Sequence, residues 1–291
     1  MKFKGIIPAL PTPLTAGEEL NAAALEQLLE HLIAQGADGF YIGGATGEGI
    51  ALDGKVRRAL ASESIRVIRH RVPAIIHIAS ANFGEAAELA RHAEAAGADA
   101  ISAIPPLFFG YGETEVYEYY KALAAAVHIP LMIYYNPNAG YRFTAESAAR
   151  LFEIDNVTAI KWTASSYDEV ARLKDLTYGE MNILNGPDEM LLQGLSAGAD
   201  GGIGTTYNLL LPRFKQLYGC FLAGQTDKAL ALQQECNRVI VELCSEPLIP
   251  ALKAALRAQG FAVGQATFPM KRINECEQQA LYERLLSAGL K

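Results

Sequence analysis

Short apolar runs alternate with longer amphipathic segments along most of this chain. Residues 3–10 (FKGIIPAL) are mostly apolar, and residues 22–36 then repeat apolar positions every three or four residues up to Gly36. An apolar run of strand length followed by a helical period predicts a strand and then an amphipathic helix. The same reasoning predicts strands at 3–10, 39–44, 73–80, 100–106, 130–135, 157–163, 181–186 and 201–206.

A predicted helix follows each predicted strand. The helical segments are 22–36, 54–70, 84–97, 114–127, 144–154, 167–176, 188–198 and 209–224. Such alternation predicts βαβ units, because parallel strands need long crossover connections. Eight units within about 225 residues match the α/β fold known as the (β/α)8 or TIM barrel. A doubly wound open sheet is the alternative, but no G-x-G-x-x-G follows the first strand to favour its dinucleotide-binding form.

The alternation stops near residue 225, and three further helices are expected near 226–244, 247–259 and 274–288. We therefore expect residues 1–291 to form a single domain, with the barrel in 1–225 and additional C-terminal helices as an appendage in 226–291. Within the barrel, Gly-Ala-Asp recurs at 36–38, 97–99 and 198–200. Each glycine stands where a helix should end, so these turns are expected at the barrel end opposite the active site.

Composition narrows the possible partners and location. The chain of 291 residues is 51% hydrophobic, has a formal net charge of −7 and shows no cluster of Lys and Arg, so nucleic acid is not expected as a partner. No apolar stretch has the length of a membrane span, and three prolines interrupt the N-terminal apolar run. The cysteines, at 220, 236, 244 and 276, form no C-x-x-C pair. A reduced, cytoplasmic protein is the simplest interpretation.

Lys161 is the first candidate for chemistry, because it lies in the predicted sixth strand, Val157–Thr163. Catalytic residues of barrels stand at the C-terminal ends of the strands. A buried lysine is costly unless it has a purpose, and a neutral amine in a dry site can attack a carbonyl carbon. A strand-end lysine that extends its amine to solvent is the structural alternative.

Other polar groups are expected at the same barrel end. Tyr134 and Tyr135 end the fifth strand, where either phenol could be core packing or a proton relay. Gly43–Glu48 forms a glycine-rich turn able to point backbone amides at a carboxylate. Asp188 and Glu189 follow the seventh strand, either as helix-start residues or as acceptors for substrate hydroxyls. The glycines of 201–206 suggest a ligand close above the barrel, and the histidines show no metal spacing, with His77 read as a core residue.

The motifs GGATGE, YYNP, IKWT and GADGGIGTTYN together resemble those of the pyruvate-dependent class I aldolases, the family of dihydrodipicolinate synthase and N-acetylneuraminate lyase. The resemblance covers nearly the whole chain. It implies that Lys161 forms an imine with a 2-keto acid such as pyruvate and that Tyr134, in preference to Tyr135, relays the proton. No metal or organic cofactor is implied, since the iminium is the electron sink. The implied substrate contacts are Ala45, Thr46, Thr163, Gly186, Asp188, Glu189, Ile203 and Thr205.

The resemblance is stronger to the lyase branch. Ala45, Phe108 and the segment 138–140 lack the hydroxyl, the phenol and the arginine of the synthase branch, whereas 185–189 and 201–208 are similar to lyase segments. Ala45 and Pro187 depart from the lyase pattern too, where serine and an aromatic residue are usual. The expected reaction is cleavage of N-acetylneuraminate to N-acetylmannosamine and pyruvate. An aldolase for another 2-keto-3-deoxy sugar acid, a dihydrodipicolinate synthase and a non-catalytic sugar-acid sensor are the alternatives. Assembly as a homotetramer is implied by the family alone.

Overall fold

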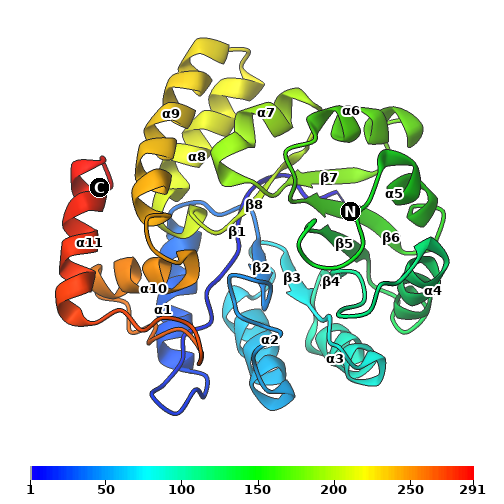
Figure 1. Cartoon of the computed structure of the whole chain (residues 1–291), viewed down its shortest axis with the longest axis horizontal. Coiled ribbons are helices and arrows are strands. Elements are labelled where there is room, and N and C mark those ends of the chain that lie inside the picture. The colour runs from blue at the N-terminus through cyan, green and yellow to red at the C-terminus, as the bar shows by residue number, and fades with distance from the viewer. Residues whose placement is uncertain (1) are drawn as a thin grey trace.

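Eight parallel strands form the centre of the computed structural model, which describes residues 2–291 (Figure 1). They are β1 (Gly5–Pro8), β2 (Phe40–Ile42), β3 (Ala74–His77), β4 (Ala100–Ala103), β5 (Leu131–Tyr135), β6 (Val157–Trp162), β7 (Asn182–Asn185) and β8 (Gly201–Gly204). Their order is β1-β8-β7-β6-β5-β4-β3-β2. A parallel bridge between Ala9 and Tyr41 joins the two edges. The TIM barrel is therefore confirmed, and the open-sheet alternative is wrong.

Helices follow the strands as predicted and surround them in Figure 1. They are α1 (Ala22–Ala34), α2 (Gly54–Ile68), α3 (Phe83–Ala96), α4 (Glu113–Ala124), α5 (Ala145–Leu151), α6 (Tyr167–Leu176), α7 (Leu191–Ser196) and α8 (Tyr207–Leu222). Because this layer covers one face of each strand and the barrel interior the other, nearly every strand residue is buried. The seventh unit differs from expectation: a 3₁₀ turn, η1 (Asp188–Met190), precedes α7, so the helix is shorter than the predicted 188–198.

The three Gly-Ala-Asp turns lie at the N-terminal ends of the strands. Gly36, Gly97 and Gly198 have φ values of +86°, +94° and +104°, a left-handed conformation that favours glycine where a helix ends. The aspartates that follow them accept backbone hydrogen bonds from neighbouring strands. Asp38 accepts from the N–H of Ile6 at 2.7 Å, and Asp99 accepts from the N–H of Ala74 at 2.8 Å. The repeated motif thus fixes the barrel end opposite the pocket.

The glycines of β8 have a different role from the one predicted. A Cβ at Gly201 would lie 2.2 Å from the carbonyl oxygen of Gly5, and one at Gly204 would lie 1.9 Å from a carboxylate oxygen of Asp188. At Gly202 it would lie 2.4 Å from the hydroxyl of Tyr207. The atoms that require glycine here belong to the protein, so these glycines do not by themselves indicate a ligand above the barrel.

The three C-terminal helices are present as α9 (Thr226–Leu243), α10 (Leu248–Ala258) and α11 (Glu275–Ser287). They lie on one side of the barrel, next to α8 and α1 in Figure 1. A fully buried ion pair connects α10 to the loop after β2: Lys253 Nζ lies 2.6 Å from Glu48 Oε1, and both side chains are 0% exposed. Glu48 Oε2 also accepts a hydrogen bond from the N–H of Thr267 at 2.6 Å. The additional helices are therefore tied to the loops at the C-terminal end of the barrel.

Candidate active site

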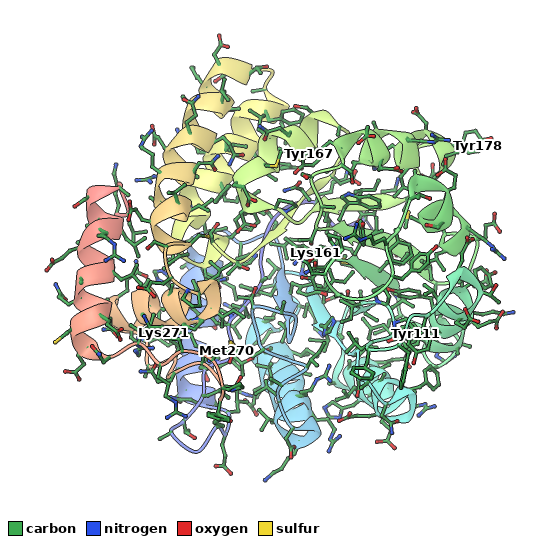
Figure 2. All side chains as sticks on the ribbon, viewed as in Figure 1. Tyr111, Lys161, Tyr167, Tyr178, Met270 and Lys271 are labelled. Atoms are coloured by element: carbon green, nitrogen blue, oxygen red, sulfur yellow. The ribbon has the colours of Figure 1, made fainter. Side chains whose placement is uncertain are left out.

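A cavity of about 730 Å³ opens at the C-terminal end of the barrel. Most of the predicted contact residues line it, together with neighbours that follow β5 to β8. The predicted residues found there are Ala45, Thr46, Tyr134, Lys161, Thr163, Gly186, Asp188, Glu189 and Thr205. Lys161 lies near the centre of the ring of helices in Figure 2, whereas Tyr111 and Tyr178 lie towards its periphery. A single pocket therefore brings together residues from positions 45 to 205.

Lys161 and Tyr134 are paired residues on adjacent strands, β6 and β5. Their exposed fractions are only 6% and 4%, although both contribute to the pocket surface. The Nζ of Lys161 lies 4.3 Å from the ring centroid of Tyr134. A lysine that extended its amine to bulk solvent would be far more exposed, so this geometry favours the chemical interpretation over the structural alternative. A phenol beside the amine can exchange a proton with a molecule bound to it.

Tyr135 points away from the pocket. Its ring lies 4.6 Å from the ring of Trp162 and 5.4 Å from that of Phe143, both in edge-on geometry. Successive residues of a strand face opposite sides, so only one of two adjacent tyrosines can face the barrel interior. The structure thus places Tyr134 in the pocket and Tyr135 in the layer between strands and helices.

The loop from Gly43 to Gly49 packs tightly against the barrel. A Cβ at Gly44 would lie 2.3 Å from the ring of Tyr41, and one at Gly49 would lie 1.8 Å from the carbonyl oxygen of Gly43. The loop therefore makes its sharp turn only with glycine at these positions. Within residues 2–291, no acceptor is found for the backbone N–H groups of Ala45 and Thr46, both of which border the pocket. This arrangement suits an anionic ligand.

Three hydrogen bonds connect this loop and η1 to the residues that follow β8. The hydroxyls of Thr46 and Thr205 lie 2.7 Å apart, so each orients the other. Oδ2 of Asp188 accepts hydrogen bonds from the backbone N–H and the hydroxyl of Thr206, at 2.7 and 2.6 Å. Oδ1 has no partner among the described residues. Burial, partly opposed by the bonds from Thr206, raises the pKa of Asp188 to about 6.

Thr163 and Gly186 lie against each other where β6 and β7 end. The N–H of Gly186 donates to the carbonyl of Trp162 at 2.8 Å, and a Cβ at Gly186 would lie 2.1 Å from the hydroxyl oxygen of Thr163. That hydroxyl has no hydrogen-bond partner within residues 2–291. Glu189, by contrast, is exposed at the mouth of the pocket. Thr163 and Glu189 thus offer polar groups at two depths.

One predicted contact residue lies elsewhere. Ile203, within β8, is completely buried and does not line the pocket. Conversely, the sequence reasoning missed the wall supplied by the C-terminal helices, which includes Ile240 and Cys244 from the end of α9 and residues 247–250 around the start of α10. Met270, labelled in Figure 2, completes this side. No polar motif marks these positions in the sequence. Only the tertiary structure shows that the C-terminal segment folds back against the pocket.

His77 lies in the barrel interior below Tyr134, with 6.0 Å between the two ring centroids. Its Nδ1 lies 3.1 Å from the carbonyl oxygen of Gly43 and donates to it, which leaves Nε2 without a partner among the described residues. Burial, reinforced by the charge of Arg57, lowers the pKa of His77 to about 3. A neutral core histidine is therefore found, as predicted, with one of its two nitrogens satisfied.

A barrel with a lysine and a tyrosine side by side in its C-terminal pocket has the architecture of a class I aldolase. The model of the dihydrodipicolinate synthetase family matches residues 2–288, and the chain belongs to that family. The N-acetylneuraminate lyase of Rhizobium meliloti is 33% identical over 283 residues, which cover 97% of this chain and 94% of the relative.

Solved structures show the same fold for members with different names. The N-acetylneuraminate lyase of Proteus mirabilis superposes with a TM-score of 0.95 over all of both chains, at 26% identity. A dihydrodipicolinate synthase of Bacillus anthracis superposes with a TM-score of 0.93 over 99% of both chains, also at 26% identity. The protein is thus an enzyme of the class I aldolase type, and the fold does not distinguish the two branches.

Among residues 2–291, no helix combines the length and apolarity needed to cross a membrane. No group of three or more His, Cys, Asp or Glu side chains in the same range is arranged to hold a metal ion. The structure contains no disulfide among Cys220, Cys236, Cys244 and Cys276.

Proposed function

We propose that this enzyme interconverts a 2-keto-3-deoxy sugar acid with pyruvate and an aldehyde, with N-acetylneuraminate and N-acetylmannosamine as the preferred pair. The observation that carries this proposal is the buried pair of Lys161 and Tyr134 at the floor of the pocket. The lyase of Rhizobium meliloti, similar along nearly its whole length, supports the choice of branch.

Lys161 provides the covalent step of the proposed mechanism. Its neutral amine attacks C2 of the open-chain keto acid, a nitrogen–carbon bond forms, and water leaves to give an iminium ion. Tyr134, assisted by the substrate carboxylate, accepts the proton of the C4 hydroxyl. The C3–C4 bond breaks, the aldehyde leaves, and the bonding electrons neutralise the iminium as an enamine. Protonation of C3 and hydrolysis of the resulting iminium release pyruvate and restore Lys161.

The surrounding groups hold the substrate in this scheme. The amides of Ala45 and Thr46 bind the carboxylate, with the Thr46–Thr205 hydroxyl pair beside it. Thr163, Gly186, Asp188 and Glu189 meet the hydroxylated remainder of the substrate, as the resemblance implies. Asp188 offers only Oδ1 for this purpose, because Oδ2 already accepts two hydrogen bonds from Thr206. The side chain of Ile203 does not line the pocket, so we propose no substrate contact for that side chain.

Other acceptors for the same chemistry are the second candidate. Ala45 lacks the hydroxyl that lyases usually carry, which removes one hydrogen bond near the carboxylate, worth about 1 kcal/mol. Pro187 lines the pocket in place of an aromatic residue, so the tail of the sugar acid meets a different surface. A dihydrodipicolinate synthase fits less well, since Ala45 and Phe108 lack two of its hydroxyl groups. Phe108 is 91% exposed in this chain.

Borohydride trapping tests the proposal. With pyruvate and borohydride, the wild-type chain is expected to gain the mass of one reduced adduct, and Lys161→Ala is expected to gain none. Lys174→Ala is the matched control, because Lys174 is also partly buried but pairs with Asp200 away from the pocket. Trapping that persisted in Lys161→Ala would refute the assignment. Pyruvate release from a panel of 2-keto-3-deoxy sugar acids then identifies the acceptor, and binding without any turnover would favour a sensor.

We also propose a homotetramer in the cytoplasm. The family resemblance supports the assembly, and the exposed rings of Phe108 and Phe109, 91% and 67% exposed, are candidates for burial between subunits. The four free thiols are compatible with a reducing compartment. Light scattering on a size-exclusion column would give the mass of the assembly, and a monomer would contradict it.

A further inference from the structure

Aromatic ring faces surround the amine of Lys161. Its Nζ lies 4.3 Å from the ring centroid of Tyr134 and 5.0 Å from that of Tyr41. Within residues 2–291 no hydrogen bond or ion pair to this nitrogen is found. The two rings meet edge to face, with centroids 5.8 Å apart and an interplanar angle of 79°. The nitrogen is therefore positioned by ring faces. Most buried lysines are instead held by a carboxylate or carbonyl oxygen.

The ring of Tyr41 is fixed from three sides. Its hydroxyl lies 2.9 Å from the hydroxyl of Ser102 on β4, and the side chain is completely buried. A Cβ at Gly44 would lie 2.3 Å from the ring, so the loop after β2 fits over it only as glycine. His77 borders the ring, with 6.2 Å between centroids. Tyr41 does not itself line the cavity, and so it acts from beneath the pocket floor.

A ring face and an oxygen acceptor differ in whether they leave the lysine nitrogen free to attack a carbonyl carbon. A carboxylate partner favours the ammonium ion and must separate from it before the nitrogen can attack. A ring face attracts the cation more weakly and also accepts N–H groups of the neutral amine. A neutral amine held in this way has a lone pair free to attack a molecule in the cavity. Burial raises the pKa of Tyr41 well above its usual value, so its phenol stays neutral and adds no charge of its own.

We propose that Tyr41 is a positioning residue, whose ring face holds the amine of Lys161 in the orientation for attack on the keto acid. This role rests on the proposed imine chemistry of Lys161. Small displacements of a nucleophile reduce rates strongly, so the ring should affect the rate of imine formation more than the binding of the keto acid. The hydroxyl of Tyr41 serves only to orient the ring through Ser102.

The test measures the rate of imine trapping by borohydride at saturating pyruvate. Four forms of the intact chain are compared: wild type, Tyr41→Phe, Tyr41→Leu, and the protein with pentafluorophenylalanine at position 41. Phenylalanine retains the ring face, and pentafluorophenylalanine retains the shape but reverses the charge distribution of that face. We expect Tyr41→Phe to remain within about 3-fold of wild type and the other two to trap about 5- to 20-fold more slowly.

Each result decides a separate point. The pyruvate concentration for half-maximal trapping should stay within about 3-fold in all four forms, which a general collapse of the pocket would not allow. Equal trapping rates with phenylalanine and pentafluorophenylalanine would overturn the proposal even if Tyr41→Leu failed to fold. Absence of trapping in the wild type, or its persistence in Lys161→Ala, would instead refute the proposed function.

Discussion

Asp188 has two carboxylate oxygens in different surroundings. One carboxylate oxygen joins η1 to the start of α8 through Thr206, and the other faces Gly204 without a hydrogen-bond partner among the described residues. The sequence alternatives, a helix-start residue or a hydroxyl acceptor, are therefore not exclusive. Asp188 does begin η1, as the first alternative has it, but its carboxylate binds Thr206 at the start of α8 and no N–H of its own helix. The oxygen without a partner leaves the second alternative as a proposal.

The raised pKa of Asp188 makes stability depend on pH. Its pKa is about 6 in the folded chain and 3.8 as the ordinary value, so the folded state holds the proton more tightly. The stability that this proton contributes is complete below pH 4 and is lost as the pH rises through 6. Between pH 4.5 and 7 the unfolding free energy should fall by about 2 kcal/mol more in wild type than in Asp188→Asn. Urea unfolding at both pH values measures this difference.

Asp227→Asn, on the exposed surface of α9, is the control and should behave like wild type. His77 contributes in the opposite direction, because its lowered pKa removes stability as the pH falls below 6.5. It is present in all three proteins and cancels from the comparison. If the unfolding free energies of wild type and Asp188→Asn depended on pH in the same way, the prediction would be contradicted. The carboxyl of Asp188 would then ionise in the folded protein as easily as in the unfolded chain.

At the scale of the elements, the ends of β6 and β7 approach each other closely beside the pocket. The N–H of Gly186 reaches the carbonyl of Trp162, and this approach leaves no room for a side chain beside Thr163. In the sequence, Gly186 appears only as part of the segment 185–189, and nothing there reveals why glycine is required. The contact that requires glycine belongs to a neighbouring strand, 23 positions earlier in the chain.

Gly186→Ala should therefore impair both stability and substrate binding. The added Cβ would lie 2.1 Å from the hydroxyl oxygen and 2.7 Å from the Cα of Thr163, and overpacking of this kind costs about 1 to 3 kcal/mol. We expect a lower melting temperature and a higher KM for the sugar acid. Gly219→Ala is the matched control, because a Cβ at this position of α8 has no atom within 4 Å. Equal melting temperatures for the two variants would contradict the packing argument.

The elements themselves were predictable because their pattern is local. Apolar runs and helical periods gave every strand, and the three C-terminal helices matched the predicted ranges within a few residues. Lys161 and Tyr134 could be identified because strand ends of a barrel converge at one face. The sequence could not show why β8 requires its glycines, because the clashing atoms of Gly5, Tyr207 and Asp188 come from other elements. The ring of Tyr41 was missed because it resembles any apolar strand residue.

On the scale of the whole molecule, the buried pair of Glu48 and Lys253 joins the first third of the chain to the last. The loop that carries Ala45 and Thr46 also contains Glu48, whose φ of +58° is unusual for a residue with a side chain. Lys253 also donates to the carbonyl of Gln265 at 2.9 Å. These contacts support our proposal that residues 1–291 form a single domain.

Lys253→Met should destabilise the whole protein, because it leaves the Glu48 carboxylate buried without its partner. Removing one member of a buried ion pair costs about 3 to 5 kcal/mol. Trp162, the only tryptophan, is buried in β6 and reports on the barrel through its fluorescence. Urea unfolding followed by this fluorescence should shift to lower urea, and far-ultraviolet circular dichroism should give the same transition.

The double variant Glu48→Gln, Lys253→Met distinguishes charge from packing. Since it removes both charges, it should recover more than half of the stability lost in Lys253→Met. No recovery would mean that the volume of Lys253 matters and its charge does not. Two separate transitions, one for the fluorescence and one for the helices, would contradict the single domain.

The wall formed by Ile240, Cys244, Leu248 and Met270 has a consequence for how this enzyme could diversify. The residues proposed to break the carbon–carbon bond lie in β5 and β6, whereas this wall comes from the last fifth of the chain. Substitutions in that last part can reshape this side of the pocket without moving Lys161 or Tyr134. Mutation and selection can therefore change which substrate the pocket accepts while the proposed bond-breaking residues are inherited unchanged.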